Sequence, residues 1–210
     1  MTSPDAAAAS AAPTPPAPPV PRRRGRPADV DPEQVALLAL RHFGEHGYEQ
    51  TTMDDIAELA GIGRRTLFRY FPSKPALVWG GIEPVVGPMH AVLEDAPAGW
   101  SVREVLAHAV TSALTLSPEA EEATRRRLAL MGAHPSLIGF GLTGMSAHRG
   151  LLLGFLAGRL GVEADSLRAQ VTTDAVSSTI FSALLWWARE DDGAPAPVVV
   201  AAIDAVLGGI

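Results

Sequence analysis

The 210-residue chain contains no cysteine, which excludes disulfide bonds, thiol catalysis and cysteine-ligated metal sites. Charged residues make up only 19 % of it, and lysine is absent after position 74. The longest uncharged stretch, residues 128–148, contains a proline and four glycines, so it would make a poor membrane-spanning helix. No apolar segment follows the arginines near the start, so no signal peptide is evident. These absences predict a cytoplasmic protein that does not span a membrane.

Motifs of the common enzyme classes are also missing. No Walker loop, HExxH or GxSxG occurs. Residues 139–144 match GxGxxG, but no predicted strand precedes them, so we interpret the match as chance in a glycine-rich segment. The six histidines lack metal-ligand spacing, and the paired acids are sequence neighbours that do not share a helical face. We therefore predict no enzymatic activity, no cofactor and no metal site.

What the chain does contain is a helix-turn-helix pattern over residues 51–74. Apolar residues recur at i, i+3, i+4 and i+7 from Met53, which predicts one buried helical face. Gly61 is expected to end that helix, and Pro72 to end a second short one. The turn between them is too short for an antiparallel pair, so the helices must cross steeply. The second helix then turns its polar face outward.

That polar face carries several cations and, between Gly63 and Lys74, no acid. A short basic helix on a helix-turn-helix fits the major groove of DNA, whereas the alternative is a solvated basic helix on any small domain. The turn, the caps and the closing Ser-Lys pair favour DNA. The predicted DNA contacts are Thr52, Arg64, Arg65, Thr66, Arg69, Tyr70 and Lys74.

Charge is distributed unevenly along the chain. Residues 1–75 hold 9 basic and 9 acidic residues, while residues 76–210 hold 8 and 14, which predicts docking on DNA by the first part only. Residues 1–21 are mostly alanine and proline and cannot build a core. The basic cluster that follows is either an arm for phosphates or the minor groove, which we favour, or a solubilising tail. Its cations are Arg22, Arg23, Arg24 and Arg26.

Residues 31–77 resemble the amino-terminal domain of the TetR family of transcriptional regulators. Within that family, IGRRTLFRYFPSK followed by VWG is similar to the regulators of mycofactocin gene clusters. Gly63 departs from the pattern, since the family often has Ser or Thr as a cap there. The matching landmarks are Phe43, Gly47, Tyr48, Thr51, Thr52, Ile56, Ala57, Ala60, Gly61, Thr66, Leu67, Phe68, Tyr70, Phe71, Ser73 and Lys74.

The patterns and the resemblance together predict an all-α fold in three parts. Residues 1–27 form the arm, residues 28–75 a three-helix DNA-binding domain, and residues 76–210 a helical domain for ligand binding and dimerisation. Beyond the helix-turn-helix, the expected helices are 32–46, 74 onward, 102–116, 118–133, 165–189 and 195/197–207. Residues 136–160 form a long apolar stretch that contains several glycines.

Two stretches of the second domain carry specific expectations. Glycines and prolines within residues 77–93 predict a kinked or broken helix there, which is either a hinge or an irregular loop. Trp79 is expected to pack between the domains. Arg125, Arg126 and Arg127 follow two glutamates at helical spacing, so we predict a solvated face of ion pairs.

The resemblance implies a dimer that pairs through residues 165–189 and 197–208 in a four-helix bundle. Two reader helices would then lie about 34 Å apart on a near-palindromic operator, with the protein at the bacterial nucleoid when bound. It also implies a small-molecule pocket, and the mycofactocin likeness an acyl thioester ligand, whose anionic head would meet Arg149, Arg159 or a histidine. Candidate pocket residues are Met131, His134, Phe140, Met145, His148, Phe155, Phe181 and Trp186.

The main hypothesis is therefore a dimeric repressor that is released by a small apolar or acyl-type ligand. One rival is a DNA-binding dimer whose second domain takes no ligand. A more distant rival is a helical small-molecule-binding or enzymatic domain with a vestigial DNA-binding part.

Overall fold

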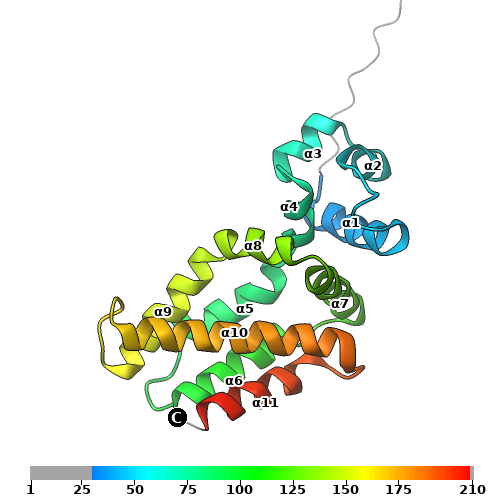
Figure 1. Cartoon of the computed structure of the whole chain (residues 1–210). Helices are drawn as coiled ribbons and strands as arrows, with labels where there is room; N and C mark the ends of the chain where they lie inside the picture. Colours follow the sequence, from blue (N-terminus) through cyan, green and yellow to red (C-terminus); the bar gives the residue numbers. More distant parts are fainter. Residues whose placement is uncertain (1–29, 209–210) are drawn as a thin grey trace, which may run out of the picture.

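The computed structural model describes residues 30–208, and every regular element within them is an α-helix, as predicted (Figure 1). The basic cluster at residues 22–26 lies outside the described residues. The helices are α1 (Pro32–His46), α2 (Met53–Leu59), α3 (Arg64–Tyr70), α4 (Lys74–Trp79), α5 (Glu83–Glu94), α6 (Val102–Ala113), α7 (Pro118–Ala133), α8 (Pro135–Gly144), α9 (Ser146–Leu160), α10 (Leu167–Glu190) and α11 (Pro195–Leu207).

Helices α1–α4 form a small unit, here termed the head, at one end of the molecule (Figure 1). Its helices begin where the sequence predicts, because the side-chain oxygens of Asp31, Thr52 and Ser73 accept hydrogen bonds from the first amides of α1, α2 and α4. Gly47 and Gly61 adopt positive φ angles of 89° and 64° just after α1 and α2. The head core is made of Phe43, Ile56, Leu67, Phe71 and Leu77.

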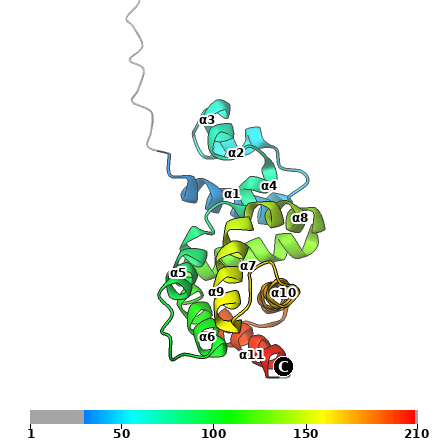
Figure 2. The same ribbon diagram turned by 90° about the vertical axis from the view of Figure 1, so that its left-hand side faces the viewer.

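Helices α5–α11 form the body. The long helix α10 runs across it and packs against α7, α9 and α11, while α11 also packs on α6 (Figures 1 and 2). Head and body share one core, because Met131, Leu137 and Trp187 of the body pack with the buried residues of the head. Within residues 30–208, no helix combines the length and the apolar character that crossing a membrane requires.

The helix between head and body is interrupted, as the glycines and prolines predict. Helix α4 ends at Trp79 and is therefore shorter than the helix expected from Lys74 onward. Gly81 follows with a φ of 69°, which favours glycine over other residues. Helix α5 then forms although Pro88 lies inside it. The sequence predicts the break, but it does not predict that Glu83–Glu94 is a regular helix, which packs on α6 and α9.

Candidate DNA interface and ligand cavity

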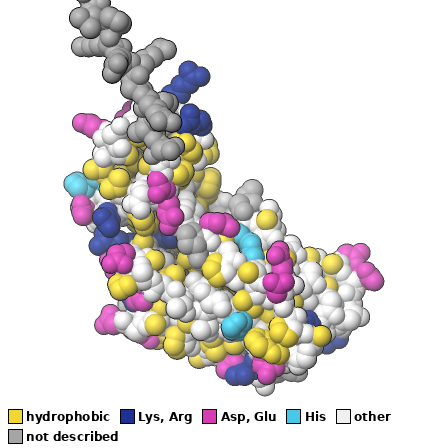
Figure 3. Space-filling view, turned by 180° about the vertical axis from the view of Figure 1, so that it is seen from behind, with side chains coloured by type: hydrophobic (Ala, Val, Ile, Leu, Met, Phe, Trp, Pro, Cys, Tyr) yellow, Lys and Arg dark blue, Asp and Glu magenta, His cyan; other side chains and the backbone are white. Residues whose placement is uncertain are grey.

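The exposed face of α3 lies at the end of the head that points away from the body (Figure 1). Leu67 is fully buried and holds α3 against the head core, so the opposite face is solvent-accessible. Arg64, Arg65 and Arg69 are exposed on it. Lys and Arg side chains project from this end in Figure 3, and Asp and Glu side chains are spread over both head and body.

Two of these arginines make side-chain contacts within the head in the absence of DNA. Arg64 forms an ion pair with Asp54 of α2, and its guanidinium lies 5.1 Å from the centre of the Phe68 ring. Arg69 donates a hydrogen bond of 3.1 Å to the hydroxyl of Tyr70. The ion pair crosses the turn, so no pattern within α3 indicates it. Both contacts are solvent-exposed and can be exchanged for contacts with DNA.

Lys74, a predicted phosphate contact, is bound internally in this structure. Its ammonium group donates hydrogen bonds to the carbonyl oxygens of Tyr48 and Thr51, at 2.8 and 3.1 Å. It also lies 4.3 Å from the centre of the Tyr48 ring. Burial raises the pKa of the Tyr48 hydroxyl to about 12, so that ring stays neutral. Lys74 thus ties the loop after α1 to the start of α4.

The body contains an apolar cavity of about 560 Å³. Of the predicted pocket residues, Met145, His148 and Phe181 line it. Sequence reasoning missed the wall formed by α5 and α6 and the contribution of Trp79 from the head. A buried stripe on a helix shows that one face is covered but not what covers it, so no sequence signal identified this wall. The missed lining residues include Trp79, Val86, Met89, His90, Val110 and Leu114.

The other five predicted pocket residues do not line this cavity. Met131 is buried in the core shared by head and body. His134 lies 3.5 Å from a carboxylate oxygen of Glu49. Phe140 is 40 % exposed and Trp186 is 48 % exposed, which places both on the surface. The fifth residue, Phe155, lies beside Arg159, whose guanidinium is 5.4 Å from the centre of the phenylalanine ring.

The two arginines proposed for an anionic ligand head are both occupied. Arg149 does line the cavity, but its guanidinium donates to Asp174 at 2.8 Å and to Gln170 at 2.7 Å. Arg159 donates to four backbone carbonyls of the loop between α5 and α6, among them that of Trp100 at 2.7 Å. Arg159 therefore closes that loop and is not part of the cavity wall.

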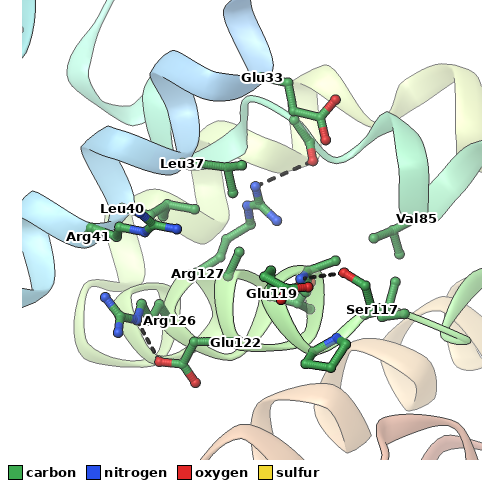
Figure 4. A pocket seen from close by; sticks show the side chains of 16 residues that line it. Glu33, Leu37, Leu40, Arg41, Val85, Ser117, Glu119, Glu122, Arg126 and Arg127 are labelled. Carbon is green, nitrogen blue, oxygen red and sulfur yellow. Dashed lines mark hydrogen bonds and ion pairs between the residues drawn. The ribbon is translucent and has the colours of Figure 1, made fainter. Parts of the chain in front are cut away.

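A second cavity of about 560 Å³ lies where α1, the linker at Gly81 and α7 meet (Figure 4). Arg127 reaches up from α7 between them, and its side chain is only 5 % exposed. It donates hydrogen bonds of 2.8 Å to Val78 O and 2.7 Å to Gly80 O. Burial lowers the pKa of its guanidinium to about 10. Arg127 therefore caps the carbonyl end of α4 with a desolvated cation.

The prediction of a solvated arginine face is thus wrong for Arg127. Arg126 does form the expected exposed pair with Glu122, at 2.6 Å. Arg125 pairs with Glu121 at 3.7 Å, but it also donates to Asp191 O and stacks 4.0 Å from the Trp187 ring. Spacing alone could not separate the three, because the side of α7 that carries Arg127 faces the linker and not solvent.

Replacing Arg127 with methionine is expected to lower the free energy of unfolding by about 2 kcal/mol. Loss of two hydrogen bonds leaves carbonyl oxygens without donors, at about 1–3 kcal/mol each. Relief of the arginine's desolvation offsets part of that cost. Urea unfolding at fixed protein concentration measures the change. The matched variant Arg126→Met should change it by less than about 0.5 kcal/mol, and equal effects would contradict the assignment.

Comparison with known proteins gives two family matches. Residues 38–78 match the model described as bacterial regulatory proteins, tetR family, and residues 100–210 match the MftR C-terminal domain. A Mycobacterium tuberculosis protein named as the mycofactocin biosynthesis transcriptional regulator MftR is 28 % identical over 188 residues, covering 90 % of this chain and 95 % of that protein. The Escherichia coli K12 regulator RutR is 30 % identical over 88 residues, 40 % of this chain and 42 % of RutR.

Solved structures with the same fold include two FadR proteins. Thermus thermophilus FadR, in complex with lauroyl-CoA, has a TM-score of 0.56 at 19 % identity and covers 86 % of this chain and 95 % of that one. Bacillus subtilis FadR, in complex with stearoyl-CoA, has a TM-score of 0.59 at 18 % identity, with 84 % and 98 % covered. At these identities the likeness establishes the fold.

Proposed function

Because the chain belongs to the TetR family of transcriptional regulators and carries an MftR C-terminal domain, we propose that it is a dimeric repressor released by an apolar, acyl-type ligand. Its relatives are regulators and not enzymes, which sets the enzymatic alternative aside.

Operator binding is assigned to the exposed face of α3. The face combines three exposed arginines with a helix short enough for the major groove. The acidic body disfavours any other approach to DNA. Thr52 would add a contact from the start of α2, where its hydroxyl already accepts a hydrogen bond from Asp55 N. Tyr70, 39 % exposed, would add one from the end of α3.

Dimerisation is assigned to the outer face of α10 and α11. Leu167, Val171 and Trp186 of α10 are 79 %, 56 % and 48 % exposed, and all three are large apolar side chains. Exposed apolar residues gathered along one helix are typical of an interface. On α11 the exposed positions include the small residues Ala201 and Ala205, which allow a close approach of a second copy. These are the helices expected to pair in a four-helix bundle.

Release from DNA is assigned to ligand binding in the apolar cavity, because Trp79 links this cavity to the head. This residue belongs to α4, the helix that directly follows the reader helix, and it also lines the cavity. Its indole nitrogen donates a 2.7 Å hydrogen bond to Leu137 O of α8. A ligand that displaces Trp79 would therefore shift α4 and the head. A coupling energy of about 1–3 kcal/mol is typical for such release.

A gel shift tests the proposal. The full-length protein is mixed with the intergenic DNA upstream of its own gene, or with a scrambled duplex. The salt concentration is about 150 mM, since salt sets the level of non-specific binding. We expect selective retention, a dimeric mass by light scattering, and release by lauroyl-CoA or stearoyl-CoA. Retention that no acyl compound reverses would support the rival, a ligand-independent DNA-binding dimer. A monomeric mass would contradict the interface.

A further inference from the structure

Two histidines supply polar groups to a cavity wall that is otherwise mostly apolar. His90 comes from α5 and His148 from α9, and both line the cavity. Their ring centroids are 4.4 Å apart, and Nδ1 of His148 makes a hydrogen-bond contact with Nε2 of His90. Both rings are partly buried, and no other hydrogen bond to either ring is found among the described residues. Each ring therefore keeps one nitrogen that the fold does not use.

The contact restricts the protons that the pair can carry. Two ring nitrogens can form a hydrogen bond only when one is protonated and the other is not, so the rings cannot both be imidazolium. Burial and the nearby His90 lower the pKa of His148, while Glu83 opposes this effect. Burial therefore favours the neutral ring of His148. When both rings are neutral, the two outer nitrogens, His90 Nδ1 and His148 Nε2, together present one donor and one acceptor.

Among the residues that the structure describes, the remaining polar groups around the cavity do not supply a free cation. On α9, Arg149 lines the cavity but is neutralised by Asp174 of α10. The indole N–H of Trp79 is already bonded to Leu137 O. Ser177 and Ser178 of α10 are uncharged, and the residues of α6 that line the cavity are apolar. A ligand carboxylate would therefore lose its hydration without gaining a cation.

We propose that the His90–His148 pair selects ligands whose polar head is an uncharged ester-type carbonyl attached to an apolar chain, and that it disfavours carboxylates. The donor nitrogen of the pair donates a hydrogen bond to the carbonyl oxygen, and the chain fills the apolar part of the cavity. This inference rests on the proposed ligand cavity and adds the chemical class of the head group. A thioester carbonyl belongs to this class, whereas a free fatty acid at neutral pH does not.

The affinities for an ester and for a carboxylate should depend differently on pH. A carboxylate can enter only if a proton is taken up, either by the acid itself or by the histidine pair, so its affinity should rise as pH falls. The slope is about tenfold per pH unit when one proton is bound, between pH 8 and pH 6. An ester requires no proton, because the neutral pair already offers a donor. Its affinity should change by no more than about twofold over the same range.

Equilibrium dialysis with methyl decanoate and sodium decanoate tests the inference on the full-length protein. At pH 7.5 the ester should bind at least about tenfold more tightly than the carboxylate, which corresponds to the desolvation cost of an unpaired charge. His148→Phe should weaken ester binding by about fivefold, through loss of one hydrogen bond, and reduce the discrimination. His148→Gln, which retains a donor and an acceptor, should restore most of it. The surface variant Arg126→Met, on α7 and outside this cavity, should leave the ratio unchanged.

Three results would overturn the inference. The first is equal binding of ester and carboxylate at pH 7.5, and the second is an unchanged ratio in both His148→Phe and His90→Phe. The third is failure of the wild-type protein to bind either probe, which would also contradict the ligand cavity of the proposed function. Ester binding with the expected ratio but without release of operator DNA supports the inference and contradicts only the proposed release mechanism.

Discussion

Operator binding is expected to fall at least about 100-fold when Arg64 and Arg69 are both replaced with alanine. Each arginine contact with a base edge or phosphate contributes about tenfold or more to affinity. The two side chains lie on the exposed face of α3, and each is already oriented, Arg64 by Asp54 and Arg69 by Tyr70. The variant should therefore lose direct contacts together with their pre-organisation. Fluorescence anisotropy with the operator duplex identified by the gel shift measures the loss of affinity.

Folding and dimer mass should be unaffected in that variant, because both arginines are exposed and neither belongs to the core of the head. Arg126→Ala is the matched control, since Arg126 also forms an exposed ion pair with an acid, but on α7 of the body. The control should bind the operator like the wild type. The dependence of affinity on salt should become shallower only in the α3 variant, because fewer phosphates are neutralised. Undiminished binding would show that α3 is not the reader helix.

A single added methyl group at Gly141 is expected to cause the largest loss of stability. The Cβ of Gly141→Ala would overlap the indole of Trp79, which crosses from the head onto α8. The indole is rigid and bonded to Leu137 O, so it cannot give way without breaking that bond. Overpacking of this kind costs about 1–3 kcal/mol, and the lost hydrogen bond adds about 1 kcal/mol.

Gly139→Ala on the same helix is the matched control. An added Cβ there meets no atom within 4 Å, so alanine should stabilise α8 by up to about 1 kcal/mol through its higher helix propensity. The two variants should thus differ by about 3 kcal/mol in urea unfolding, measured at one protein concentration because the stability of the proposed dimer would depend on it. The Gly141→Ala protein should also show altered tryptophan fluorescence. A neutral effect at Gly141 would contradict the close packing of Trp79 on α8.

These glycines illustrate the limits of sequence reasoning. Both lie in the GxGxxG match, and the structure places them in helix α8 and not in a phosphate loop after a strand. Gly141 nevertheless requires glycine, because Trp79, 62 positions earlier in the chain, packs against it. Spacing within the segment cannot express a contact with a residue so distant in sequence.

Local sequence patterns were sufficient to predict the family, the all-α class and the start of most helices. Caps such as Thr52 and Ser101 act on amides two or three residues away, and apolar periodicity is a property of one helix. Both signals are local, so they survive without knowledge of the fold. The exposed arginine face of α3 belongs to this group, because the turn at Gly61 and the buried Leu67 define it within a few residues.

Which helix faces meet depends on tertiary packing. Arg126 and Arg127 are neighbours in one basic run, yet one is solvated and the other is buried against the end of α4. His90 and His148 are 58 positions apart and become a pair because α5 packs on α9. A side chain's environment depends on the elements that pack over it, and those are chosen by the burial of whole faces. The cavity, the Arg127 cap and the histidine pair therefore emerge only when the helices are assembled.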